Sequence, residues 1–118
     1  MMVEDINEID PGRLNKKGMF QRSIETKDAA GQKSIGWVDI FTSKISVEII
    51  PISGRELLSA QQVKGEVTHR IRCRYRPGLS AANRFIFRDR IFDLQSVINV
   101  REAGVMLEIM AKEGLTNG

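Results

Sequence analysis

One stretch decides the fold of this chain: EVTHRIRCRYRP, at residues 66–77, in which the side chains alternate strictly in character. Arginine occupies every second position from Arg70 to Arg76, and the positions between them are largely apolar. The side chains of a β-strand point to opposite faces with a period of two residues. The stretch therefore predicts one long strand, with an arginine row (Arg70, Arg72, Arg74 and Arg76) on one face and a buried face behind it.

Working outward, alternating apolar residues predict further strands that are separated by turn residues. The run Ile49-Ile50-Pro51-Ile52 interrupts this alternation. The pattern predicts a mainly β protein, a small antiparallel β-barrel of about six strands with one short helix on an excursion. The other strands are expected at residues 18–26, 34–47, 84–87, 90–100 and 105–112, with turns at 28–31, 88–89 and 103–104.

The short helix is expected at about residues 54–63. Ser53-Gly54-Arg55-Glu56 has the form of a capping box. In such a box the serine accepts a hydrogen bond from the backbone N–H of the glutamate, whose carboxylate accepts from the serine N–H. A helix of two or three turns is marginal by itself. We therefore expect it to pack on the sheet or on a neighbouring subunit.

Length and composition indicate a single domain. The chain has 118 residues, of which 42% are hydrophobic, and no apolar run approaches the roughly 20 residues of a membrane-spanning helix. We expect the barrel domain at residues 16–113, a flexible acidic arm at residues 1–15 and a frayed tail at residues 114–118.

The charge is distributed unevenly. The chain carries a net charge of +3, yet its first ten residues contain Glu4, Asp5, Glu8 and Asp10 and no lysine or arginine. Such an arm is either a frayed soluble terminus or a tail that docks on the basic body of a neighbour. It lacks the basic flank of a signal peptide, and the single Cys73 suits a reducing compartment, so we expect the chain in a cytoplasm.

The residues do not form a catalytic or metal-binding pattern. His69, the only histidine, shares a strand face with Cys73, but four residues of strand separate them by roughly 13 Å. A nucleophile and its base must lie about 3 Å apart. Asp89 and Asp93 do not form a credible acid–base pair, and no glycine-rich phosphate loop is present. We therefore expect no enzyme activity, metal or cofactor.

Three interpretations of the arginine row remain open. The row can be a solvated face that is paired with carboxylates such as Glu108 or Glu48, a phosphate-binding surface, or a contact surface for an acidic protein. Stacking on single-stranded nucleic acid needs exposed aromatic side chains. Tyr75 points to the opposite face and Trp37 lies on a strand with an apolar stripe, which weakens the nucleic-acid interpretation.

Several segments in order resemble the head–tail joining (head closure, or stopper) proteins of tailed bacteriophages and prophages. The resemblance spans about residues 13–113. The segments that carry it are Trp37-Val38-Asp39, Phe41-Thr42, Ser46-Val47-Glu48, Pro51-Ile52-Ser53-Gly54-Arg55-Glu56-Leu57, Val67-Thr68-His69-Arg70, Arg74-Tyr75-Arg76, Arg84 and Asp89-Arg90-Ile91-Phe92-Asp93.

This resemblance implies a non-enzymatic virion protein. Such proteins assemble below the portal and its adaptor as a ring, which closes the head after DNA packaging and offers the tail a docking surface. Double-stranded DNA passes nearby without sequence-specific binding, and the isolated chain can be a monomer made in the host cytoplasm. Subunit or adaptor contacts are expected at Ser53, Gly54, Arg55, Glu56, Arg70, Arg72, Arg74 and Arg76. The alternative is a small basic β-barrel that binds single-stranded nucleic acid.

The chain departs from the family pattern at three places. Ser43-Lys44-Ile45 stands where the family usually has Val-Trp-Ala, and Ile49 and Ile50 are two extra residues before Pro51. Both changes lie where the strand is expected to leave the barrel toward the helix. Arg88 replaces the glycine expected in the turn at residues 88–89.

Overall fold

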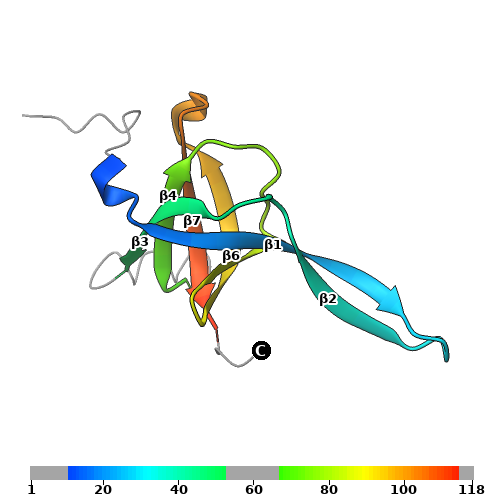
Figure 1. Cartoon of the computed structure of the whole chain (residues 1–118). Helices are drawn as coiled ribbons and strands as arrows, with labels where there is room; N and C mark the ends of the chain where they lie inside the picture. The colour runs from blue at the N-terminus through cyan, green and yellow to red at the C-terminus, as the bar shows by residue number, and fades with distance from the viewer. Residues whose placement is uncertain (1–10, 53–66, 115–118) are drawn as a thin grey trace, which may run out of the picture.

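The computed structural model describes residues 11–52 and 67–114 (Figure 1). The expected helix at about 54–63 and its capping box lie outside these residues. No helix in the described part of the chain is long and apolar enough to cross a bilayer. The elements are η1 (Pro11–Arg13), β1 (Lys16–Lys27), β2 (Lys33–Asp39), β3 (Ile45–Pro51), β4 (His69–Arg74), β5 (Arg84–Phe87), β6 (Arg90–Asn99), η2 (Val100–Glu102) and β7 (Met106–Glu113).

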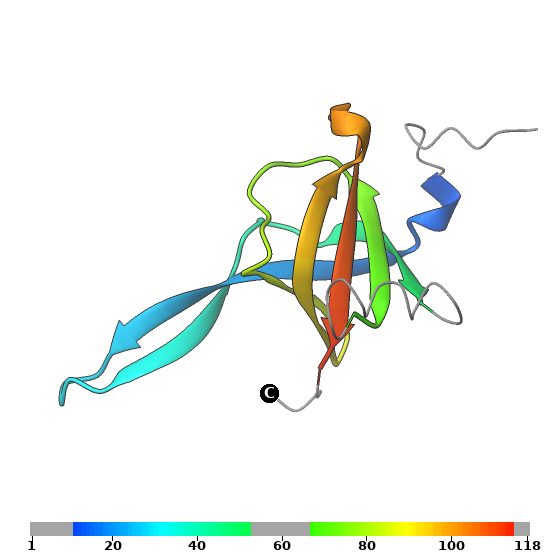
Figure 2. The same cartoon turned by 180° about the vertical axis from the view of Figure 1, so that it is seen from behind.

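Six of these strands close into an antiparallel barrel. Their order is β1-β3-β4-β7-β6-β5, and β5 pairs back to β1 through Met19–Gln21 and Arg84–Ile86. Figures 1 and 2 show β1 running across the wall that β4, β7 and β6 form. The predicted mainly β fold and small antiparallel barrel are confirmed, with β2 as a seventh strand outside the ring.

The strand β1 is longer than the barrel and continues into a projecting ribbon. Its residues Gln21–Lys27 pair with Lys33–Asp39 of β2, a length of roughly 20 Å. The ribbon points away from the barrel in both views (Figures 1 and 2). One strand therefore belongs to two structures, the closed barrel and the free-standing ribbon.

The prediction of one strand over residues 34–47 is wrong, because the chain leaves the sheet between β2 and β3. Gln21 pairs with Asp39 and Gly18 pairs with Ile45, so six steps along this segment match three steps along β1. The extra length lets Phe41 turn toward the core, where its ring lies edge-on at 6.2 Å from Phe20. Packing of the Phe41 ring against Phe20 is thus incompatible with continuous pairing of this segment to β1.

Apolar residues from all six barrel strands fill the interior. The rings of Phe20 and Phe85 lie 4.6 Å apart between their centroids. Leu14, in the last part of the expected arm, is also buried. The alternation read in the sequence is confirmed by the buried side chains Ile71 and Cys73 of β4 and Leu107, Ile109 and Ala111 of β7, although Met106 at the start of β7 is buried as well. The largest fully buried side chains are Phe20, Phe85, Phe92, Ile71, Ile109, Val47, Val67 and Cys73.

The arginine strand is shorter than expected. It spans only His69–Arg74, instead of continuing to Pro77. Arg74 lies opposite Met106, the first residue of β7, and only one further backbone hydrogen bond follows, from Tyr75 N–H to the carbonyl oxygen of Val105 at 2.9 Å. Tyr75 was expected on the buried face but is 42% exposed beyond the end of the strand. The length of β4 is therefore set by where its partner strand β7 begins, and not by the alternation in the sequence.

The extra residues Ile49 and Ile50 lengthen β3 instead of interrupting it. They lie opposite Ile71 and Arg70 of β4, and the strand continues to Pro51. The expected interruption is therefore wrong. Proline is tolerated at this position because it ends the strand, where the missing N–H costs little.

The two-residue turn between β5 and β6 has the predicted position. Arg88 adopts a φ of 56°, in the left-handed region that favours glycine. This conformation explains why glycine is expected there. The guanidinium group of Arg88 lies 5.1 Å from the centroid of the Phe87 ring, a contact that glycine would lack.

Candidate protein-interaction surface

The arginine row on the outer face of β4 divides into two halves with different surroundings. In the first half, Arg70 Nε and Arg72 Nη2 each lie 3.2 Å from Glu108 Oε1, and Arg72 Nε donates to the same oxygen at 3.2 Å. Glu108 faces Arg72 in the register of β4 and β7. The expected pairing with Glu108 is confirmed for these two arginines, so their charge is partly neutralised within the chain.

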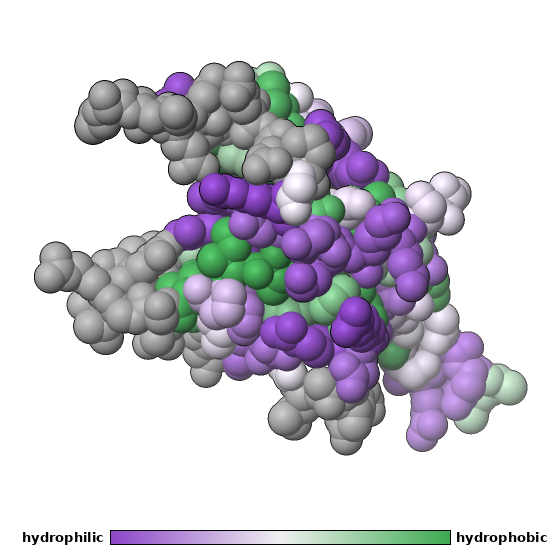
Figure 3. All heavy atoms as spheres, turned by 60° about the vertical axis from the view of Figure 1, so that its left-hand side comes forward, coloured by the Kyte–Doolittle hydropathy of each residue, from purple (hydrophilic) through white to green (hydrophobic). Residues whose placement is uncertain are grey.

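The second half, Arg74 and Arg76, lies where β4 ends. The guanidinium of Arg76 stacks 4.9 Å from the centroid of the Phe41 ring, and Arg74 is exposed. Both line a shallow cleft of about 270 Å³, which we call the basic cleft. Figure 3 shows the side of the molecule on which η1 and β3 lie, with hydrophilic residues gathered around an apolar patch. The cleft is lined by Leu14, Ser43, Lys44, Ile45, Ser46, Arg74 and Arg76.

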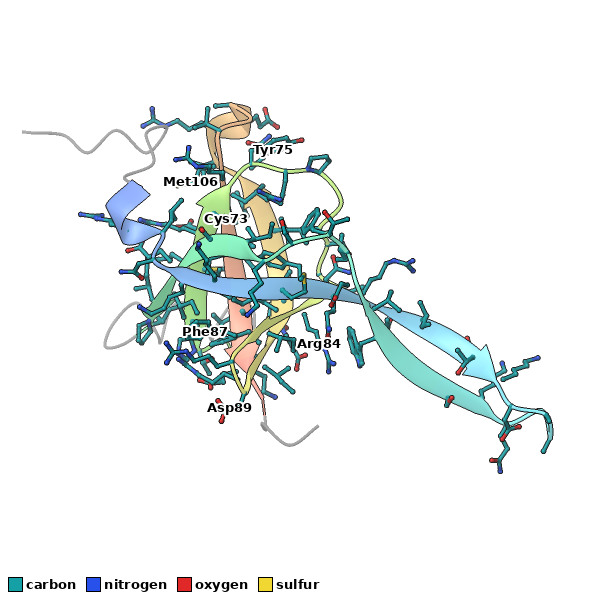
Figure 4. All side chains as sticks on the ribbon, viewed as in Figure 1. Cys73, Tyr75, Arg84, Phe87, Asp89 and Met106 are labelled. Carbon is teal, nitrogen blue, oxygen red and sulfur yellow. The ribbon has the colours of Figure 1, made fainter. Side chains whose placement is uncertain are left out.

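A polar cluster holds the ribbon where it leaves the barrel. Gln21 Nε2 donates to Asp39 Oδ1 at 2.9 Å, and Arg84 Nε donates to Gln21 Oε1 at 2.9 Å. The Arg84 guanidinium lies 4.1 Å from the centroid of the Trp37 ring. Figure 4 shows Arg84 at this junction. The cluster joins β1, β2 and β5, and so sets the direction of the ribbon.

Burial lowers the pKa of the Arg84 guanidinium, and the carboxylate of Asp93 opposes that shift. The group stays charged at neutral pH. Its positive charge faces the Trp37 ring, an arrangement typical of a cation–π contact. Trp37 is therefore engaged within the chain and its ring is half-buried.

Beyond this junction the ribbon is almost entirely exposed. Ile35 is 72% exposed, and Glu25 forms only a solvent-exposed pair with Lys33 at 3.3 Å. Exposed pairs of this kind contribute little stability. Across the ribbon, Arg22–Lys27 of β1 and Lys33–Asp39 of β2 have pairing partners on one edge only among the described residues. The ribbon therefore offers two free edges to other molecules.

The only histidine has a structural environment. His69 Nδ1 lies 2.8 Å from Thr68 Oγ1, and its ring packs edge-on at 5.1 Å from Phe92. Arg90 donates to both carboxylate oxygens of Glu113, at 2.8 and 3.0 Å, and His69 Nε2 lies 3.7 Å from Glu113. Within residues 11–52 and 67–114, no three His, Cys, Asp or Glu side chains are grouped to hold a metal ion.

The protonation of these groups follows from their contacts. Burial lowers the pKa of His69, against the attraction of Glu113. Hydrogen bonding to Arg90 lowers the pKa of Glu113 and raises the pKa of Arg90. Burial raises the pKa of the Cys73 thiol to about 11. A buried thiol and a histidine beside the Arg90–Glu113 ion pair are structural features, not a nucleophile and its base.

Comparison with known proteins gives the family of this chain. A family model described as phage head completion protein matches residues 9–114. The chain belongs to the phage head completion protein family. The predicted resemblance to phage head–tail joining proteins is thereby confirmed, and the chain is a structural virion protein.

Two relatives are similar in sequence. The chain is 25% identical over 111 residues to head completion protein gp7 of Enterobacteria phage HK97, a match that covers 90% of this chain and 97% of that protein. It is 33% identical over 72 residues to head completion protein gp16 of Bacillus phage SPP1, where the match covers 61% of this chain and 64% of that protein.

Two solved structures share the fold of this head completion protein. The solution structure of a Shigella flexneri 2a protein aligns with a TM-score of 0.72 at 24% identity, covering 90% of this chain and 97% of that one. A chain in the virion of a native gene transfer agent particle aligns with a TM-score of 0.58 at 19% identity, covering 86% and 96%. At these identities the likeness shows the fold.

Acid is expected to destabilise this head completion protein through Glu113 and His69. Both have a lowered pKa when folded, so their stabilisation is present above the ordinary values of 4.5 and 6.5 and is lost as the pH falls through the lower, folded values. Glu113→Gln should reduce the free energy of unfolding at pH 7 by about 1–2 kcal/mol and flatten its decline toward pH 4, as measured by urea denaturation.

The matched control for this change is Glu25→Gln on the ribbon, which removes only the exposed pair with Lys33. It should alter stability by less than about 0.5 kcal/mol at either pH. Parallel acid profiles for Glu113→Gln and the unchanged protein would contradict the role assigned to Glu113.

The structure brings together some predicted residues and reveals others. Ser53, Gly54, Arg55 and Glu56 lie outside the described residues. Sequence reasoning missed the basic cleft because Lys44 and Ser43 come from the detour between β2 and β3, far from Arg74 in the chain. The one signal was the departure from the family pattern at Ser43-Lys44-Ile45. No feature of the sequence indicated the contacts among Gln21, Arg84 and Trp37.

Proposed function

We propose that this head completion protein assembles as a ring at the head–tail connector, closes the DNA-filled head and provides the docking surface for the tail. Its partners are then the portal or adaptor ring, the tail proteins and further copies of itself. Double-stranded DNA passes nearby without sequence-specific contacts. Before assembly the chain is in the host cytoplasm.

The projecting ribbon is the observation that carries this proposal. A two-stranded hairpin is at best marginally stable in water, and free strand edges invite pairing with other chains. Here Arg84, Gln21 and Trp37 hold such a hairpin away from the barrel and expose Ile35. A rigidly anchored but uncovered ribbon is useful to a protein whose neighbours cover it in an assembly.

The charged residues support the same proposal. Arg70 and Arg72 already share Glu108, so we assign contacts between subunits, or with the adaptor, mainly to Arg74 and Arg76. The box at Ser53, Gly54, Arg55 and Glu56 is assigned a contact of the same kind, on the sequence alone.

The alternative, binding of single-stranded nucleic acid, has less support. Stacking of bases needs free aromatic faces beside a basic track. Trp37 is covered by Arg84, Phe41 by Arg76, and two arginines of the row are paired with Glu108. Tyr75 is the one strongly exposed aromatic side chain in the part of the chain that the structure describes.

Shortening the ribbon tests the proposal. Ile24 lies opposite Gly36, so residues 25–35 can be replaced by Asn-Gly, which favours a two-residue hairpin turn. The melting temperature should stay within a few degrees, because the ribbon adds little to the core. In cells that carry the phage genome without this gene, the variant should yield DNA-filled heads without tails, or emptied heads, as counted by electron microscopy.

The control is Lys33→Gln, which breaks the exposed pair with Glu25 but keeps the ribbon at full length. This variant should support normal yields of tailed particles. Wild-type yields of tailed particles with the shortened ribbon would overturn the proposal.

A further inference from the structure

The basic cleft has an unbalanced charge. Arg74, Arg76 and Lys44 line it together with the hydroxyl groups of Ser43 and Ser46. No carboxylate lies among its lining residues in the described part of the chain. By contrast, Arg70 and Arg72, farther along the same row, share Glu108. The cleft is therefore cationic and hydrogen-bonding without a counter-ion from its own lining.

The geometry of the cleft suits a carboxylate. The guanidinium carbon of Arg76 lies 4.9 Å from the centroid of the Phe41 ring, and its buried Nε has no hydrogen-bond acceptor in the described part of the chain. Guanidinium groups bind carboxylates through parallel N–H···O bonds, and a group fixed in advance loses less entropy on binding. A cleft of about 270 Å³ accommodates an acidic side chain and its flanking backbone.

We propose that the basic cleft binds the acidic N-terminal segment, residues 4–10, of the neighbouring copy, so that each subunit clasps the next. This inference rests on the proposed ring. It assigns a segment that carries Glu4, Asp5, Glu8 and Asp10 and no cation to a cleft that carries three cations and no anion. The complementarity gives the contact a direction, from one subunit to the next.

The position and reach of the segment also fit. Leu14, which follows η1, lines the cleft itself. The segment of each copy is therefore joined to the described chain near the face that carries its own cleft. The seven residues of the segment span up to about 25 Å when fully extended. This length is close to the shortest dimension of the molecule, 26 Å, so the segment can reach a cleft on the facing side of an adjacent barrel.

Site-directed crosslinking in assembled heads tests the inference. The variant Glu8→Cys with Ser43→Cys places one thiol on the segment and one at the cleft. Native Cys73 is fully buried and its pKa is raised to about 11, so it does not compete. After mild oxidation, non-reducing gels should show a ladder of covalent oligomers. The matched control pairs Glu8→Cys with Asp89→Cys, in the exposed turn at the opposite end of the barrel (Figure 4), and should stay monomeric.

The remaining outcomes each decide the question. Monomers with an internal crosslink would overturn the contact between copies, because the segment would then occupy its own cleft. Heads with visible neck rings but no crosslinks would overturn this inference and leave the ring intact. Heads without any ring of this protein would remove both the inference and the proposed function.

Charge reversal separates the segment from DNA as the occupant. Arg74→Glu should lower the yield of tailed particles at least tenfold, and changing Glu4, Asp5, Glu8 and Asp10 to lysine in the same chain should restore most of it. If Arg74→Glu instead lowers DNA retention by filter binding and the lysine changes do not restore particles, the cleft binds phosphate and the inference is wrong.

Discussion

Replacing Gly18 with alanine is expected to destabilise the protein by roughly 3 kcal/mol or more, at the upper end of what overpacking costs. A Cβ at this position would collide with the backbone carbonyl oxygen of Ile86 and lie 2.5 Å from Phe85 Cζ. A backbone oxygen cannot move aside as a flexible side chain can. The clash falls where β1 and β5 join to close the barrel, so urea denaturation should show a large drop in the free energy of unfolding.

Gly36→Ala is the matched control because it adds the same methyl group to the ribbon. Its Cβ would meet only Ile24 Cγ1, at an ordinary 3.7 Å. Alanine should leave stability unchanged or raise it by up to about 1 kcal/mol, since it restricts the unfolded chain. Equal destabilisation by both changes would show that strand propensity, not the close approach at Gly18, controls the effect.

Replacing Phe20 with alanine is expected to lower the free energy of unfolding by about 3–5 kcal/mol. The ring is fully buried, packs 4.6 Å from the Phe85 ring between centroids and meets the edge of Phe41 at 6.2 Å. Because β1 joins β3 on one edge and β5 on the other, the cavity would lie at the closure of the barrel. Thermal and urea unfolding measure the loss directly.

Ile35→Ala is the control, since that side chain is 72% exposed on the ribbon. It should change stability by less than about 0.5 kcal/mol. If Phe20→Ala costs no more than Ile35→Ala, the barrel does not depend on the aromatic contacts at its closure. Phe20→Leu should recover part of the loss, because leucine fills most of the cavity.

The class of fold was predictable because period-two alternation is a local property of the chain. Ile71 and Cys73 lie inside and Arg70 and Arg72 outside, as their spacing predicts. Where strands end was less predictable. Tyr75 continues the alternation but lies beyond the end of β4, because β7 begins opposite Arg74 and only one further backbone hydrogen bond, from Tyr75 to Val105, follows it.

The residues of the arginine row were predictable from the sequence, but the different surroundings of its two halves were not. Arg70, Arg72, Arg74 and Arg76 follow one pattern, yet two of them meet Glu108 on β7 and the others border a cleft that includes Lys44. Arg72 and Glu108 are 36 positions apart. A repeated sequence feature cannot show which of its members will find such a distant partner.

By itself the sequence determined the alternation of inner and outer side chains along the central strands, the antiparallel β class and the likeness to phage head–tail joining proteins, because alternation and local motifs act between neighbouring residues. Only the tertiary structure decided that β1 serves both the barrel and the ribbon, and that one half of the arginine row pairs with Glu108 while the other half borders the basic cleft. Both outcomes depend on which distant strands pair with one another, and that choice is made by packing of the whole core.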